Sequence, residues 1–198
     1  MTNGGRTLEA IRYNRGSLEI LNQLLLPWES IYEAVSGVED GHKVIKTMKV
    51  RGAPAIAIVA ALSLAVDLHN QSIKTLTTPS SVATYVHDQL KYLKTSRPTA
   101  VNLFEAAARL DRITSTAAQT AESASQVLDA YIDAAEAMLV QDIEDNKNIG
   151  KFGAQFILDN KPELHEGVQV LTHCNTGSLA TAGWVSYTLI SKPHSQIS

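Results

Sequence analysis

An apolar run, a polar turn and a series of small residues follow one another in Val168-Gln169-Val170-Leu171-Thr172-His173-Cys174-Asn175-Thr176-Gly177-Ser178-Leu179-Ala180-Thr181-Ala182-Gly183. This order predicts a buried β-strand at 168–173, then a turn and the start of a helix. Cys174 is the one cysteine of the chain and follows the strand directly. Open α/β sheets bind ligands at the carboxyl edge of their strands, so we expect chemistry at this cysteine.

Two interpretations of Cys174 follow from its position. It is a reactive thiol, whose pKa a helix N-terminus lowers, or a buried cysteine that packs as a small hydrophobic residue. The polar run after it favours the reactive thiol, because it supplies N–H and hydroxyl donors that also suit a phosphate. His173 points to the opposite face of a strand, which favours a packed histidine over a base for the thiol.

Composition narrows the class of protein. The chain has 198 residues, of which 44% are hydrophobic and 19% charged, as in an ordinary globular protein. A net charge of −3 offers no basic surface for nucleic acid or for a membrane. One cysteine excludes an internal disulfide framework and fits a reducing compartment. The N-terminus has no secretory signal, so we expect a cytoplasmic or nuclear location.

The chain before the quoted stretch predicts a hairpin followed by helices. Strands at 7–13 and 17–22 flank an Asn14-Arg15-Gly16 turn, and a third strand is expected near 31–33. The apolar run from Ala53 to Val66 is too short to span a bilayer and predicts a core helix. Other helices are expected around Val44 and Met48, from Val82 to Leu93, from a Thr99 cap to Thr114, from Glu122 to Asp145 and from Phe152 to Leu158, with a loop or weak helix over 115–125 and a helix end at Asn148-Ile149-Gly150.

These elements predict an α+β or α/β chain in three parts. Residues 1–160 form a hairpin and a helical bundle, 161–184 begin a Rossmann-like parallel-sheet domain, and 185–198 are a divergent tail. A parallel strand needs a long crossover before its neighbour can pair with it, and no second strand is found after 183. We therefore expect only the first strand and the helix start of that domain, so the strand pairs with another chain or stays disordered.

Two arginines precede predicted helices. Arg51 comes before Gly52, Ala53 and Pro54, where a guanidinium beside free helix N–H groups suits a phosphate. Arg97 precedes the helix that is expected to run from a Thr99 cap to Thr114. Each alone is more typical of an interhelix turn, but together with the polar turn they favour a sugar-phosphate pocket. The six histidines show no metal-ligand spacing and no P-loop is present. The acidic residues Asp142, Glu144 and Asp145 are expected to form a solvated helix end.

Five segments of the chain resemble the S-methyl-5-thioribose-1-phosphate isomerases, the aldose–ketose isomerases of methionine salvage. They are Leu8-Glu9-Ala10-Ile11-Arg12-Tyr13, Met48-Lys49-Val50-Arg51-Gly52-Ala53-Pro54-Ala55-Ile56, Ser96-Arg97-Pro98-Thr99-Ala100-Val101-Asn102-Leu103, Asp145-Asn146-Lys147-Asn148-Ile149-Gly150 and Leu171-Thr172-His173-Cys174-Asn175-Thr176-Gly177-Ser178-Leu179-Ala180-Thr181-Ala182-Gly183. Their order along the chain matches that of the family.

The resemblance implies which residues form the site. Arg51, Gly52, Ala53 and Arg97 correspond to substrate-binding positions, and Cys174 corresponds to a catalytic cysteine. The implied reaction opens the furanose ring of the 1-phosphate and shifts the carbonyl between C1 and C2. The resemblance implies a small sugar-phosphate substrate, no redox cofactor, no metal, no nucleic acid and no membrane. Full-length members of the family are homodimers.

The resemblance ends at about Gly183 and Trp184. The family pairs its cysteine with an aspartate that lies much later in the chain, and no such residue follows here. An acid–base pair without one member loses several powers of ten in rate. We therefore expect a truncated product, from alternative splicing or a misread gene model, with little or no isomerase activity.

Three other interpretations stay open. The regulatory subunits of the initiation-factor 2B exchange complex resemble this family in fold and act as interaction proteins. Arg51 and Cys174 favour the isomerase over that scaffold, which needs no thiol beside a phosphate turn. Ribose-1,5-bisphosphate isomerase is a sister enzyme that the match around Cys174 does not exclude. The third interpretation is that the short chain binds a full-length subunit through its N-terminal domain.

Overall fold

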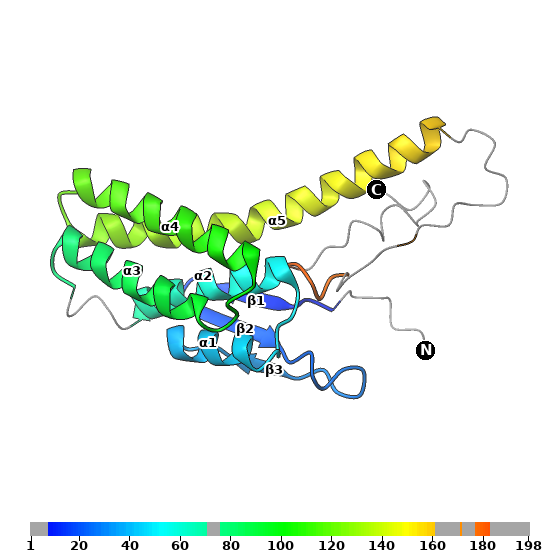
Figure 1. The fold of residues 1–198 in the computed structure, drawn as a ribbon, viewed down its shortest axis with the longest axis horizontal. Helices are drawn as coiled ribbons and strands as arrows, with labels where there is room; N and C mark the ends of the chain where they lie inside the picture. Colours follow the sequence, from blue (N-terminus) through cyan, green and yellow to red (C-terminus); the bar gives the residue numbers. More distant parts are fainter. Residues whose placement is uncertain (1–7, 71–75, 161–170, 172–176, 183–198) are drawn as a thin grey trace.

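The fold is known from a computed structural model that describes residues 8–70, 76–160, 171 and 177–182. Within these residues the chain forms three strands and five helices (Figure 1). The strands β1 (Ile11–Asn14), β2 (Ser17–Leu21) and β3 (Tyr32–Ala34) make an antiparallel sheet in the order β1-β2-β3. This confirms the predicted N-terminal hairpin and third strand.

The hairpin turn has two residues. Asn14 pairs with Ser17, so Arg15 and Gly16 form the loop between β1 and β2. Gly16 has a φ of 85°, a left-handed conformation that glycine adopts without strain. Two-residue hairpin loops need such positive φ angles, because their twist must match that of the strands.

The helices are α1 (Val38–Lys46), α2 (Ala53–Asn70), α3 (Pro79–Lys94), α4 (Val101–Thr120) and α5 (Ala124–Asn160). The central helix is α2, which contacts the other four helices and strands β1 and β2. The apolar run was expected to be too short to span a bilayer. The helix that contains it has 18 residues and is long and apolar enough to cross one. However, 78% of it is buried inside the protein, as predicted for a core helix.

The helix α4 starts later and ends later than its sequence predicts. A turn in which Ala100 N–H donates to the Arg97 carbonyl makes Ala100 the N-cap, so Thr99 is not the cap. The helix then continues to Thr120 through the region expected to be a loop or weak helix. Thr114 Oγ1 donates to the Leu110 carbonyl at 2.8 Å, so this hydroxyl is satisfied within the helix.

The helix α5 is continuous over 37 residues, so the predicted end at Asn148-Ile149-Gly150 is wrong. A glycine ends a helix when it adopts the left-handed conformation, and Gly150 does not have a positive φ. The ladder of main-chain hydrogen bonds therefore continues. The separate helix expected at 152–158 is the last part of α5.

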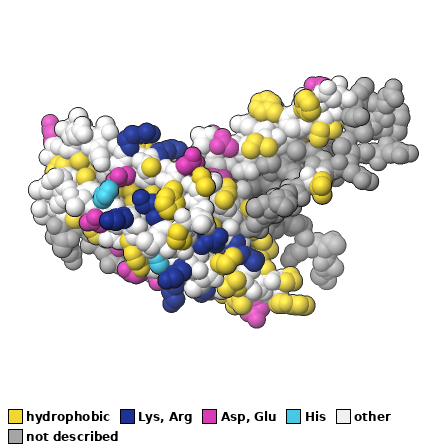
Figure 2. Space-filling view, viewed as in Figure 1, with side chains coloured by type: hydrophobic (Ala, Val, Ile, Leu, Met, Phe, Trp, Pro, Cys, Tyr) yellow, Lys and Arg dark blue, Asp and Glu magenta, His cyan; other side chains and the backbone are white. Residues whose placement is uncertain are grey.

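The second half of α5 extends beyond the bundle (Figure 1). Its first half supplies the buried residues from Val127 to Ala135, and Gly150 is the one buried position beyond them. Ile149, Phe152 and Phe156 are 58%, 64% and 68% exposed. These residues are three and four positions apart and share one face. Figure 2 shows hydrophobic side chains gathered over this part of the molecule.

Most of the strand predicted at 168–173 lies outside the described residues, as do the boundaries at 161 and 184. Leu171 is described; it belongs to no strand and is 97% exposed. A buried strand needs neighbours for its N–H and C=O groups, and the sheet β1-β2-β3 does not include Leu171. At this residue the prediction of a buried strand is wrong.

Candidate functional site

The turn between α1 and α2 presents Arg51. The helix α1 ends at Lys46, and Met48, which was expected on this helix, lies in the turn. Met48 N–H donates to the Ile45 carbonyl and Lys49 N–H to the Val44 carbonyl, each at 3.0 Å. This pair of bonds is the Schellman pattern, which usually has glycine where Met48 stands with a φ of 61°. The chain thus reverses direction just before Arg51.

Replacing Met48 by glycine is expected to stabilise the protein. A side chain at a positive φ is strained by about 1 kcal/mol, and glycine removes this strain. We expect the free energy of unfolding, measured by urea denaturation, to rise by about 0.5–1 kcal/mol. The matched control is Met48→Ala, which keeps the β-carbon and should leave stability nearly unchanged. An equal gain in both variants would contradict this explanation.

Gln23 connects the Arg51 turn to the sheet. Its N–H donates to the Lys49 carbonyl at 3.0 Å, and its carbonyl accepts Arg51 Nη2 at 3.1 Å. Lys49 Nζ in turn donates to Glu33 on β3 at 2.6 Å, and this bond lowers the pKa of Glu33. The Arg51 guanidinium is therefore held at one nitrogen, while its side chain stays exposed.

The segment 177–182 packs against the start of α2. Ala55 N–H donates to the Ala180 carbonyl at 3.1 Å, and the Gln23 amide donates to the Leu179 carbonyl at 2.7 Å. A β-carbon on Gly52 would lie 2.2 Å from the Ala180 Cα, which no side chain permits. Glycine at position 52 therefore allows the two main chains to touch.

Asp142 on α5 holds the other end of this segment. Its Oδ2 accepts the Ala182 N–H at 2.7 Å. Asp142 is half-buried, and this burial raises its pKa above the usual range. The predicted solvated helix end is therefore wrong for Asp142, although Glu144 and Asp145 are exposed as expected. Solvation was the wrong expectation because a segment 40 residues further along the chain covers this carboxylate.

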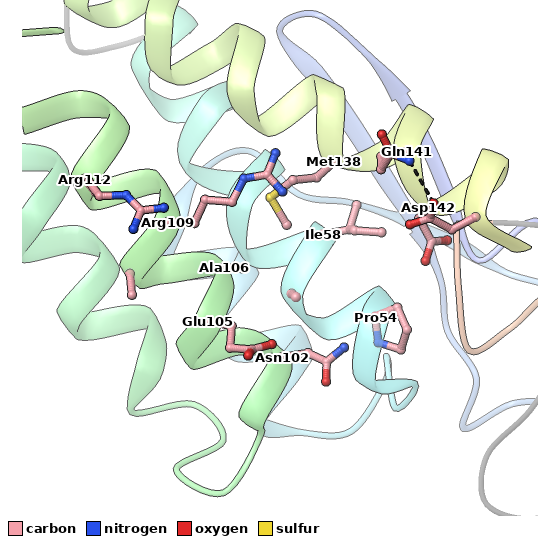
Figure 3. Close-up of a pocket in the computed structure, with 13 residues that line it drawn as sticks. Pro54, Ile58, Asn102, Glu105, Ala106, Arg109, Arg112, Met138, Gln141 and Asp142 are labelled. Atoms are coloured by element: carbon pink, nitrogen blue, oxygen red, sulfur yellow. Dashed lines mark hydrogen bonds between the residues drawn. The ribbon is translucent and has the colours of Figure 1, made fainter. Parts of the chain in front are cut away.

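A cavity of about 640 Å³ opens between α2, α4 and α5 (Figure 3). Pro54 at the start of α2 and Asn102 at the start of α4 lie at the same end of it. Asp142 lies on the side next to the segment 177–182. The cavity thus lies between the helix that follows Arg51 and the helix that follows Arg97, although neither arginine is among its lining residues, and its volume suits a small metabolite.

Arg97 lies in the turn that leads into α4. Its Nη1 is buried and has no hydrogen-bond partner among the described residues. Buried N–H donors are nearly always paired, and an unpaired donor on a cation is especially unfavourable. An anionic ligand is one partner that would satisfy this nitrogen.

The structure places the predicted site residues in two groups. Arg51, Gly52 and Ala53 share one turn, and Arg97 precedes the neighbouring helix start. Cys174 lies outside the described residues, so its reactivity stays a prediction. Among the described residues no group of three or more His, Cys, Asp and Glu could hold a metal ion.

Sequence reasoning missed Gln23 and Asp142. The pair Asn22-Gln23 directly follows an apolar strand, and that break in pattern is the signal for Gln23. Gln23 is only 2% exposed, whereas most glutamine side chains lie on the surface. The sequence carries no comparable signal for Asp142.

The fold and the site together define an α+β protein in which Arg51 precedes the buried helix α2 and Arg97 precedes α4, a class suited to small anionic ligands. A sequence profile described as the Initiation factor 2 subunit family matches residues 49–195. The chain belongs to this family.

Similar proteins fall into two groups. The methylthioribose-1-phosphate isomerase of Aspergillus terreus is 51% identical over 181 residues, which are 90% of this chain and 48% of that protein. The crystal structure of 5-methylthioribose 1-phosphate isomerase from Pyrococcus horikoshii matches with a TM-score of 0.76 and 32% identity, over 92% of this chain and 48% of that one. Translation initiation factor eIF-2B subunit delta from A. fulgidus matches with a TM-score of 0.71 and 30% identity, over 90% and 48%. The chain spans about half the length of the curated relatives it matches.

Proposed function

We propose that this chain supplies the substrate-binding half of an aldose–ketose isomerase. The reaction converts S-methyl-5-thio-α-D-ribose 1-phosphate to S-methyl-5-thio-D-ribulose 1-phosphate. The observation that carries the proposal is the Nη1 of Arg97, which is buried just before the start of α4 and has no hydrogen-bond partner among the described residues. The identity of 51% to a methylthioribose-1-phosphate isomerase supports this substrate.

Each residue has a role in this proposal. The phosphate binds Arg51 beside the N-terminus of α2, where the helix dipole favours an anion. Arg97 donates to a sugar or phosphate oxygen and so satisfies its buried nitrogen. Cys174 moves the proton between C1 and C2 as an acid–base group. The resemblance places the aspartate that completes this pair in a part of the relatives with no counterpart in these 198 residues.

Binding without rapid turnover is therefore expected. We expect the purified chain to bind S-methyl-5-thioribose 1-phosphate in isothermal titration calorimetry. Arg97→Leu should weaken binding by about 10- to 100-fold, because it removes charge-assisted hydrogen bonds made by a buried nitrogen. The control is Lys91→Leu, which removes one exposed cation from α3. Equal affinity of wild type and Arg97→Leu would contradict the role of Arg97.

Turnover is measured on the same preparations. We expect little or no isomerase activity, and Cys174→Ala should keep the affinity of the wild type. Turnover that disappears in Cys174→Ala would show that the distant aspartate is dispensable, contrary to the proposal.

A regulatory or interaction subunit is the second candidate, favoured by the structural match to the eIF-2B delta subunit. Such a protein has no need to bind a sugar phosphate. Ribose 1,5-bisphosphate is the remaining alternative substrate. Titrating both sugar phosphates separates the three possibilities, because only an isomerase of the proposed kind prefers the methylthio sugar.

A further inference from the structure

The segment 177–182 is attached to three separate parts of the protein. Gln23, after β2, holds the Leu179 carbonyl, and Ala55 on α2 holds the Ala180 carbonyl. Asp142 holds the Ala182 N–H from α5. These bonds run along one short segment, so its position relative to the Arg51 turn depends on each of them. Asp142 determines where its last residues lie.

The attachment through Asp142 carries a free-energy cost, because it half-buries a carboxylate. A carboxylate accepting a main-chain N–H forms a strong, charge-assisted hydrogen bond, and 2.7 Å is the length expected for one. However, half-burying a charge disfavours it, and Asp145 one turn later adds repulsion. An apolar side chain here would avoid the buried charge but would leave the N–H of the buried Ala182 without its acceptor. The arrangement therefore points to a requirement for position.

The contact made by this segment lies beside the proposed substrate turn. Ala180 rests on Gly52 with no room for a side chain between them, and Gly52 follows Arg51 directly. If Ala182 is released, only the bonds to Leu179 and Ala180 still hold the segment, so we expect Ala180 to leave Gly52 more often. The segment also begins three residues after Cys174 in the sequence.

We propose that Asp142 is a positioning residue that holds the segment 177–182 against the N-terminus of α2. In this role it keeps Ala180 against Gly52, the residue after Arg51, without touching the substrate. The effect on ligand binding rests on the proposed function, whereas the attachment of the segment does not.

Amide hydrogen exchange of the segment 177–182 tests the attachment directly. In Asp142→Ala we expect exchange about 10-fold or more faster than in wild type, because the acceptor of the Ala182 N–H is gone. Alanine is a strong helix former, so α5 itself should not be weakened. Asp142→Asn keeps an acceptor oxygen and should restore slow exchange. Glu144→Gln removes an exposed charge from the same turn of α5 and should behave as wild type.

The same variants are then titrated with S-methyl-5-thioribose 1-phosphate. We expect Asp142→Ala to bind about 10-fold more weakly, with Asp142→Asn close to wild type. If Asp142→Ala does not fold, Asp142→Glu takes its place, since it keeps the charge but shifts the carboxylate by one methylene.

Equal exchange in wild type and Asp142→Ala would overturn the inference. Fast exchange in Asp142→Asn or in Glu144→Gln would also overturn it, because the effect would then not follow the acceptor. Failure of the wild type to bind the sugar phosphate would count against the proposed function alone, since the exchange result decides the attachment separately.

Discussion

A Gly52→Val variant is expected to lose the contact between the segment 177–182 and α2. The new β-carbon would lie 2.2 Å from both the Cα and the carbonyl oxygen of Ala180. Both partners are main chain, so no change of rotamer relieves the overlap. The segment must leave its place or α2 must shift, and overpacking of this kind costs about 1–3 kcal/mol. Because Gly52 follows Arg51, we expect affinity for the sugar phosphate to fall by about 5- to 150-fold, the range that corresponds to this cost.

Hydrogen exchange of the segment 177–182 and titration with the sugar phosphate check this prediction together. Ala53→Val is the control for the exchange measurement, because it enlarges the exposed next residue. Slow exchange in Gly52→Val would mean that the segment is not docked on α2.

Replacing Tyr131 by alanine is expected to cause the largest loss of stability in the bundle. Tyr131 on α5 is fully buried, and its hydroxyl donates to the Ala61 carbonyl of α2 at 3.2 Å. Removing such a ring leaves a large cavity at the contact between these helices and costs about 3–5 kcal/mol. We expect that decrease in the free energy of unfolding by urea denaturation.

The matched variant Tyr131→Phe separates packing from hydrogen bonding. It keeps the ring and removes only the hydroxyl, so a loss of about 1 kcal/mol is expected. If Tyr131→Phe were as unstable as Tyr131→Ala, the hydrogen bond and not the packing would dominate.

Much of the fold was predictable because it depends on local patterns. The Arg15-Gly16 turn between alternating strands indicates a hairpin, and the structure has it. The apolar sequence of α2 indicates a helix buried on all sides, and 14 of its residues are buried. These signals act within a few residues, through turn conformations and hydrophobic periodicity.

Helix ends were less predictable. Asn148 and Gly150 are typical residues of a helix end, yet α5 passes through them to Asn160. Thr99 is a typical cap, yet a turn places the start of α4 after Ala100. In each case the residue type is compatible with a helix end but does not require one. The surrounding main-chain hydrogen bonds determine where the helix begins or ends.

The candidate site also has features that the sequence predicts and features that only the structure shows. Arg51 and Gly52 stand out in the sequence, because an arginine and a glycine before a helix have a direct use in anion binding. That Gly52 also receives the main chain of Ala180 depends on packing between distant segments. The buried nitrogen of Arg97 likewise became visible only in the folded chain.

The sequence by itself determined the hairpin, the central helix, the family resemblance and the turn that carries Arg51. Only the tertiary structure brought Gln23 to Leu179, 156 residues away, and Asp142 to Ala182, 40 residues away. The physical reason is that turn and helix preferences arise from neighbouring residues. The hydrogen-bond partner of a polar side chain depends instead on which distant segment packs beside it. The packing of the other helices and the sheet around α2 determines which segment that is.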